Sequence, residues 1–250
     1  MAEYDRQYQT VDRSSTVSRA GIDEGLRAFM LGIYNNMALG LAITGVAAFA
    51  TFYFAVDQSA GTLTGFGQAV YASPLKWLIM FAPLLFVFGF SAGINRMQPS
   101  TARMVFFAFA AVMGMSLSTI FLVFTGQSIV QTFFITAAAF GGLSLWGYTT
   151  KKDLSGWGSF LVMGLIGIII AMIVNIFLAS SALQFAISAL GVLIFAGLTA
   201  YDTQRLKHTY DYVSGDTVAA GRASIMGALQ LYLDFINLFM FMLQFLGNRN

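Results

Sequence analysis

The stretch SIMGALQLYLDFINLFMFMLQFL, residues 224–246, is long and apolar enough to cross a lipid bilayer as one helix. About 20 residues, each rising about 1.5 Å, match the hydrocarbon core of a bilayer. Yet the stretch carries the carboxyl group of Asp234, about ten residues from its start and so roughly 15 Å deep. Charged groups at such depth are costly and usually mark function. The stretch therefore predicts a membrane-spanning helix with a functional polar face.

Six further apolar stretches of about 20 residues precede this one. The chain is 58% hydrophobic and only 10% charged, whereas a typical soluble domain carries about 25% charged residues. The alternation of barrel strands is absent, so helices remain as the spanning structure. We therefore predict an all-α, polytopic membrane bundle of seven transmembrane helices, forming one domain over residues 29–250. The expected spans are 31–55, 76–96, 103–125, 129–149, 159–180, 182–203 and 224–246.

Residues 1–28 are polar and carry nine charges of both signs. No apolar segment of the kind found in secretory signals follows at a suitable distance. We expect a polar, mostly disordered, cytoplasmic N-terminal tail. With the N-terminus inside, eleven basic residues fall on the inner side, and only Lys76 and Arg249 fall outside. This bias follows the positive-inside rule and predicts a multi-pass protein with a cytoplasmic N-terminus.

Polar side chains form stripes on two consecutive spans. Residues four, seven and fourteen positions apart lie on one helix face. In the seventh span these are Gln230, Asp234, Asn237 and Gln244, and in the sixth they are Ser188, Thr199 and Asp202. The stripes predict a shared interior or a water-filled path, with Asn175 of the fifth span as a further lining candidate. The alternative is that the amides hold helices together, and that Asp202 extends to the cytoplasmic edge.

Asp202 and Asp234 are the candidate pH sensor. Two carboxyl groups that meet in a low dielectric cannot both ionise cheaply, so they share a proton. They also offer the hard oxygen ligands that calcium prefers, but too few for a tight cage, which predicts a weak, hydrated transit site. The pair closes only if the sixth helix continues past Lys207 or the seventh begins near the inner surface. Arg96 at the inner end of the second span is the candidate latch, with extension into water as its alternative role.

Other chemistry has no support in the sequence. The chain has no Cys, so it forms no disulfide or zinc thiolate, and it lacks nucleotide-binding loops and hydrolase motifs. We expect no enzyme activity, no cofactor and no nucleic-acid partner. His208 is expected to be a solvated loop residue. An intramembrane aspartyl protease is a weak alternative: Tyr201-Asp202 resembles its first motif, but Tyr232-Leu233 stands where the glycines of its second motif belong.

Five segments together resemble the Bax-inhibitor family, the transmembrane Bax-inhibitor-motif proteins, in its bacterial branch. The resemblance extends from about Gly25 to Gly247. The last two segments are the most specific, and the final one contains the buried carboxyl group of Asp234. The segments are YNNMALG (34–40), KKDLS (151–155), VNIF (174–177), TAYDTQ (199–204) and ALQLYLDFINLF (228–239).

The resemblance implies a seven-helix bundle with the seventh helix at its centre, in the bacterial inner (plasma) membrane. It implies a pH-sensitive calcium leak channel, whose partners are the lipid bilayer, calcium ions and protons. Its gate is an aspartate pair on helices six and seven, matching Asp202 and Asp234, and an arginine of the second helix, nearest to Arg96, latches the closed pore. The competing function is a non-transporting regulatory protein that modulates a membrane protease or a stress response through residues 1–28.

Overall fold

The computed structural model describes the backbone of residues 2–249 and the side chains from Glu24 to Arg249. Among these residues, seven helices are long and apolar enough to cross a membrane, which confirms the predicted all-α membrane bundle. The sixth and seventh spans are longer than expected and extend toward each other. The spans are Glu24–Ala55, Leu75–Arg96, Pro99–Val123, Gly126–Thr149, Ser155–Leu178, Ser181–Val213 and Thr217–Leu246.

Short helical turns complete the bundle, two of them in the connection between the first two spans. In chain order the elements are α1 (Ala2–Ala55), α2 (Gly65–Gly67), η1 (Gln68–Ala72), α3 (Leu75–Gly93), η2 (Ile94–Arg96), α4 (Pro99–Leu117), α5 (Ile120–Val123), α6 (Gly126–Thr149), α7 (Ser155–Leu178), α8 (Ser181–Val213) and α9 (Thr217–Leu246). The connection between the first two spans, residues 57–74, is thus partly helical.

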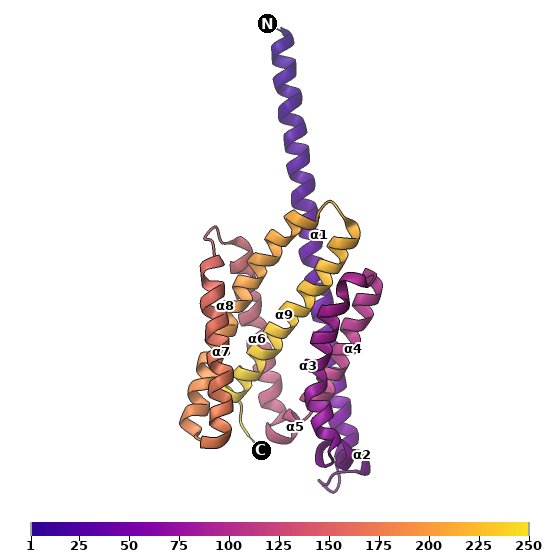
Figure 1. Cartoon of the computed structure of the whole chain (residues 1–250), viewed down its shortest axis with the longest axis vertical. Helices are drawn as coiled ribbons and strands as arrows, with labels where there is room; N and C mark the ends of the chain where they lie inside the picture. The colour runs from indigo at the N-terminus through magenta and orange to yellow at the C-terminus, as the bar shows by residue number, and fades with distance from the viewer. Residues whose placement is uncertain (1, 250) are drawn as a thin grey trace.

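The backbone of α1 is helical from Ala2 (Figure 1), where the sequence predicts a mostly disordered tail. Extending a helix that already exists needs no new nucleation, so polar residues can continue it at little cost. The side chains of residues 1–23 lie outside the described part of the structure. The cytoplasmic position of the tail stays a prediction.

Local sequence sets the ends of the helices. The side-chain oxygens of Thr125, Ser180 and Asp216 accept hydrogen bonds from the first backbone N–H groups of α6, α8 and α9. Such caps satisfy donors that have no partner inside the helix. The backbone N–H groups of Ala219 and Val218 also lower the pKa of Asp216. The capped turn places α8 and α9 side by side as a long antiparallel hairpin (Figure 1).

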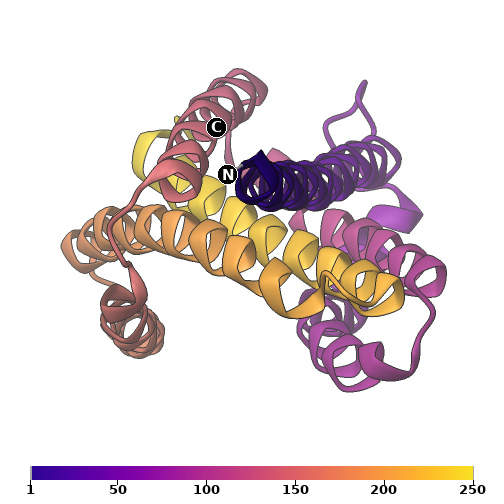
Figure 2. The ribbon, with the colours of Figure 1, turned by 90° about the horizontal axis from the view of Figure 1, so that it is seen from above.

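Helix α9 lies at the centre of the bundle, as the family resemblance implies. In its most apolar stretch 72% of the residues are buried, against 11% to 33% in the other six spans. Figure 2 shows α9 between α1 and α4 on one side and α6 and α8 on the other. The side chains of Leu231, Tyr232 and Leu243 are wholly buried. An apolar helix without an exposed face belongs in an interior.

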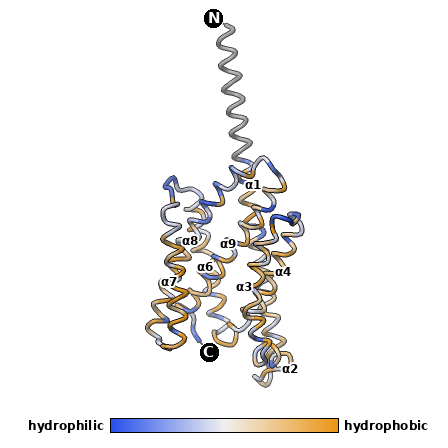
Figure 3. The backbone as a smooth tube through the Cα atoms, viewed as in Figure 1, coloured by the Kyte–Doolittle hydropathy of each residue, from blue (hydrophilic) through white to orange (hydrophobic). Residues whose placement is uncertain are grey.

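The outer helices present apolar side chains to the surroundings. Phe177 and Ile176 of α7 are 84% and 77% exposed, as expected for side chains that face lipid. Polar residues gather where the helices end, at the end of the bundle where α8 ends and α9 begins (Figure 3). This end also carries the basic residues that the structure describes, apart from Lys76 and Arg249. We call it the basic end.

Tyr232 fastens α9 to α1 and α4. Its hydroxyl lies 2.6 Å from Oγ1 of Thr44, which in turn lies 2.9 Å from the carbonyl oxygen of Ala110. The ring packs edge-on against Phe106 and Phe109. One hydroxyl group therefore links three helices in the interior.

We expect Tyr232→Phe to lower the free energy of unfolding by about 1 kcal/mol, because the ring packing survives and one buried hydrogen bond is lost. Thermal unfolding in detergent micelles measures the change. Tyr53→Phe is the matched control, since Tyr53 is 53% exposed. Equal unfolding temperatures for the two variants would contradict a stabilising role of the buried hydroxyl.

Candidate functional site

The structure brings together the two carboxyl groups that the sequence singles out. Asp202 of α8 and Asp234 of α9 are 5% and 6% exposed, and their side chains hydrogen-bond to each other. Both conditions for closing the pair are met. Helix α8 continues past Lys207 to Val213, and α9 begins at Thr217, so the hairpin carries the two residues to the same level.

Gln230 joins the pair as a third member. It stands one helical turn before Asp234 on α9, and its side chain hydrogen-bonds to Asp202. Residues four positions apart point from the same helix face. Helix α9 thus presents an amide and a carboxyl group to one carboxyl group of α8.

The hydrogen bonding of Asp202 and Asp234 indicates that a proton can lie between the two carboxyl groups. Oδ2 of Asp234 is buried without a hydrogen-bond donor among the described residues when both groups are taken as carboxylates. Two carboxyl groups can hydrogen-bond only when one of them carries a proton and donates it. The cation whose charge acts on Asp202 is Arg205, three positions further along α8. The site can therefore hold one proton and one negative charge.

The hydroxyl groups beside the pair are satisfied within the bundle. Thr199 is fully buried, and its Oγ1 donates to the carbonyl oxygen of Phe195 at 2.7 Å on its own helix. Thr203 donates likewise to the carbonyl oxygen of Thr199 at 2.8 Å and lies 3.4 Å from Oγ of Ser144 on α6. Thr199, predicted as a pathway-lining residue, is thus engaged with the backbone in this structure.

Gln204 is a positioning residue that the sequence analysis missed. Its amide donates to the carbonyl oxygen of Lys152 at 2.8 Å, and its Oε1 accepts from the backbone N–H of Leu154 at 2.8 Å. These bonds fix the connection between α6 and α7 against α8, next to Asp202. One signal in the sequence could have indicated the role of Gln204. Two segments that resemble the family, 151–155 and 199–204, each carry polar residues at a helix end.

The predicted stripe of α9 divides into two separate groups. Gln244 stands ten residues after Asp234, or about 15 Å along the helix. Its Oε1 accepts from Nε2 of Gln184 at 2.8 Å, and the Nδ2 of Asn175 lies 3.2 Å from Oε1 of Gln184. These amides link α7, α8 and α9 at the end opposite the basic end. Asn237, between the two groups, donates to the carbonyl oxygen of Leu233 at 2.8 Å on its own helix.

Arg96 is not at the carboxyl pair. It ends the short η2 turn and is exposed, because a cation at a helix end remains hydrated at low cost. The neighbouring Met97 is instead tied to the start of α9, where Nε of Arg222 donates to its carbonyl oxygen at 2.7 Å. In this structure Arg205, rather than Arg96, supplies the positive charge near Asp202.

The donor set suits a transient ion better than a resident one. Among the described residues, no three His, Cys, Asp or Glu side chains lie close enough to hold a metal ion together. Two carboxyl groups and one amide fall short of the six to eight oxygens of a tight calcium site. His208 lies exposed on α8 rather than in a loop, because that helix continues beyond its expected end.

Comparisons with known proteins identify the family of the chain. The family model described as inhibitor of apoptosis-promoting Bax1 matches residues 26–250. A protein of Caulobacter vibrioides is 48% identical over 99% of this chain and 98% of its own length. Inner membrane protein YbhL of Escherichia coli is 43% identical over 90% of this chain and 93% of its own. The matched region contains all but the first two residues of the seven spans and the whole carboxyl site, and the chain therefore belongs to the Bax inhibitor family.

Proposed function

We propose that this chain is a pH-sensitive cation leak channel of the bacterial inner membrane, not an enzyme, with calcium as the favoured ion. The observation that carries the proposal is the buried, hydrogen-bonded pair Asp202–Asp234 on the central hairpin. Buried carboxyl groups inside membrane spans commonly mark ion pathways and proton sensors. The relative YbhL is named only as an inner membrane protein, which supports the location and leaves transport as our proposal. From the positive-inside rule we expect the basic end to lie in the cytoplasm.

The gate in this proposal is the charge of the pair. With one proton the pair carries one negative charge, which Arg205 balances and to which the amide of Gln230 donates. Hydrogen bonds to a charged acceptor are roughly twice as strong as neutral ones. A second proton removes the charge, weakens the hold of α8 on α9, and shifts the equilibrium toward an open state. We therefore expect the leak to increase as the pH falls.

The choice of ion follows from the ligands along the hairpin. Carboxyl and amide oxygens are the groups that calcium prefers. Because the set is small, the ion keeps most of its water and leaves again readily, which conduction requires. Calcium is thus the transported substrate and not a bound cofactor.

The direct test is calcium influx into liposomes that contain the purified full chain, followed with a trapped dye between about pH 8 and pH 6. We expect a flux that increases toward acid and depends on the protein, because protonation discharges the pair. Protein-free liposomes are the control. No flux at any pH, from protein shown to be folded, would contradict the proposal and favour the non-transporting regulator of a membrane protease.

A further inference from the structure

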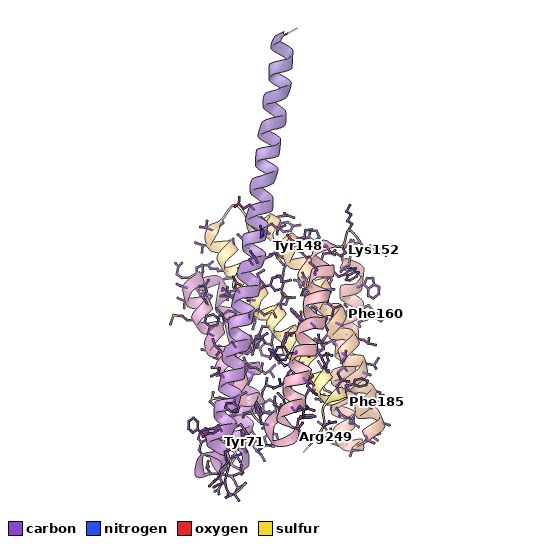
Figure 4. The ribbon with its side chains drawn as sticks, turned by 180° about the vertical axis from the view of Figure 1, so that it is seen from behind. Tyr71, Tyr148, Lys152, Phe160, Phe185 and Arg249 are labelled. Atoms are coloured by element: carbon purple, nitrogen blue, oxygen red, sulfur yellow. The ribbon has the colours of Figure 1, made fainter. Side chains whose placement is uncertain are left out.

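A groove runs between α1 and α6, and α9 forms its floor. Its deep part is a cavity of about 600 Å³, walled by residues 38–48 of α1 and by Val130, Phe133 and Phe134 of α6. Phe235 and Phe239 of α9 close it from below. Seen from behind, α9 is visible between α1 and α6 (Figure 4). The lining is almost wholly apolar, and Phe134 is 66% exposed.

Toward the basic end, a second pocket of about 290 Å³ lies between the same two helices. Here the lining changes from apolar to amphipathic, with Arg27 and Tyr34 from α1 and Ser144 and Tyr148 from α6. The two pockets lie on one stripe of each helix, because their residues recur every three or four positions. On α1 the stripe from residue 27 to residue 45 is about 27 Å long, close to the thickness of the hydrocarbon core.

The charge at the basic end of the groove is positive. Arg27 is exposed and lines the pocket, and no acidic side chain is part of that lining. Lys207 is not part of the lining but contacts the lining residue Tyr148, with Nζ 5.2 Å from the ring centre of Tyr148 and 3.2 Å from its carbonyl oxygen. The groove thus has a cationic, hydroxyl-bearing head and a long apolar body, which is the pattern of a phospholipid.

We propose that this groove binds one anionic phospholipid from the leaflet at the basic end of the bundle. The phosphate lies against Arg27, with Lys207 and the hydroxyl of Tyr148 beside it. One acyl chain follows α1 and α6 into the deep cavity over Phe235. Basic pockets between membrane helices on the cytoplasmic side bind anionic headgroups by the same chemistry.

The lining of the groove favours a lipid over a helix of a partner protein. The deep part is almost wholly apolar, whereas the cationic and hydroxyl-bearing groups gather at the basic end. A phospholipid carries its charge and its apolar chains in that order, whereas a membrane-spanning helix is apolar along its whole length in the hydrocarbon core.

The test is native mass spectrometry of the full chain in detergent, titrated with phosphatidylglycerol or with phosphatidylcholine of the same acyl chains. We expect one phosphatidylglycerol per protein and weaker binding of phosphatidylcholine. Arg27→Gln should weaken phosphatidylglycerol binding about fivefold, the contribution of one basic residue near an anionic lipid surface. Lys151→Gln is the control, because Lys151 is exposed at the same end and does not line the groove.

Two neighbouring glycines of α6 allow a steric test of where the lipid binds. Gly141 lines the pocket at the basic end and Gly142 does not, and an added Cβ has open space at both positions. Gly141→Leu should block lipid binding, and Gly142→Leu should leave it unchanged. Equal binding of the two lipids, equal effects of Arg27→Gln and Lys151→Gln, or equal effects of the two leucine variants would each overturn the proposal. Formation of a dimer that excludes lipid would overturn it as well.

Discussion

Asp234→Asn is expected to abolish the pH response of calcium flux, so that the ratio of flux at pH 6 to flux at pH 8 falls to about 1. The amide keeps the shape of the side chain and donates to Asp202 at every pH. Asp202 is then a lone carboxylate beside Arg205 and two amide groups, and it keeps its charge across this pH range, so the hold between α8 and α9 no longer changes with pH. Calcium influx into liposomes, measured beside the wild-type chain across the same pH range, tests this result.

Asp211→Asn is the matched control for this experiment. This variant makes the same change on α8, from a carboxyl group to an amide, but Asp211 is exposed near the end of that helix. Its pH response should equal that of the wild-type chain. A pH response that persists in Asp234→Asn, at normal expression and folding, would place the sensor elsewhere. A response lost in both variants would show that the assay detects surface charge and not the buried pair.

Gly147→Leu is expected to lower the free energy of unfolding by about 3 kcal/mol or more, because overpacking at a rigid contact displaces backbone. Gly147 of α6 faces the backbone of Ala200 on α8, and an added Cβ would meet the carbonyl group of that residue. The side chain of Ala200 is small and the obstacle is main chain, so a rotamer change cannot relieve the clash. The contact lies two positions from Asp202, so α8 must shift at the candidate site.

Thermal unfolding of detergent-solubilised protein measures this effect. Gly142→Leu is the control on the same helix, since an added Cβ there meets no atom within 4 Å. Its unfolding temperature should stay near that of the wild-type chain. If Gly147→Leu were as stable as Gly142→Leu, α6 and α8 could separate at Gly147 without cost. The close approach of these two helices would then contribute nothing to the free energy of unfolding.

The membrane class and the number of spans could be predicted from composition and segment length alone. Both signals are local: apolar stretches of about 20 residues can be satisfied by one helix each, whatever their neighbours are. Asp234 could be singled out for the same reason, because its cost depends on its depth in one span. The central position of α9 came from the family resemblance and is confirmed by its burial.

The meeting of Asp202 with Asp234 depended on where two helices end, which sequence patterns define poorly. The sequence analysis ended the sixth span at residue 203. In the structure α8 continues to Val213, so Asp202 lies within this helix and not at its end. Likewise, one polar stripe on α9 became two groups, because its members find partners on different helices: Asp202 for Gln230, and Gln184 for Gln244.

The sequence by itself determined that this is a seven-span helical membrane protein with a costly carboxyl group in its last span, since those properties belong to single segments. Only the tertiary structure decided which carboxyl groups meet, that Arg205 and not Arg96 lies near Asp202, and that α1 and α6 leave a groove over α9. Contacts between helices depend on the crossing and register of whole elements, to which each residue contributes little. That is why the composition of any one segment could not reveal them.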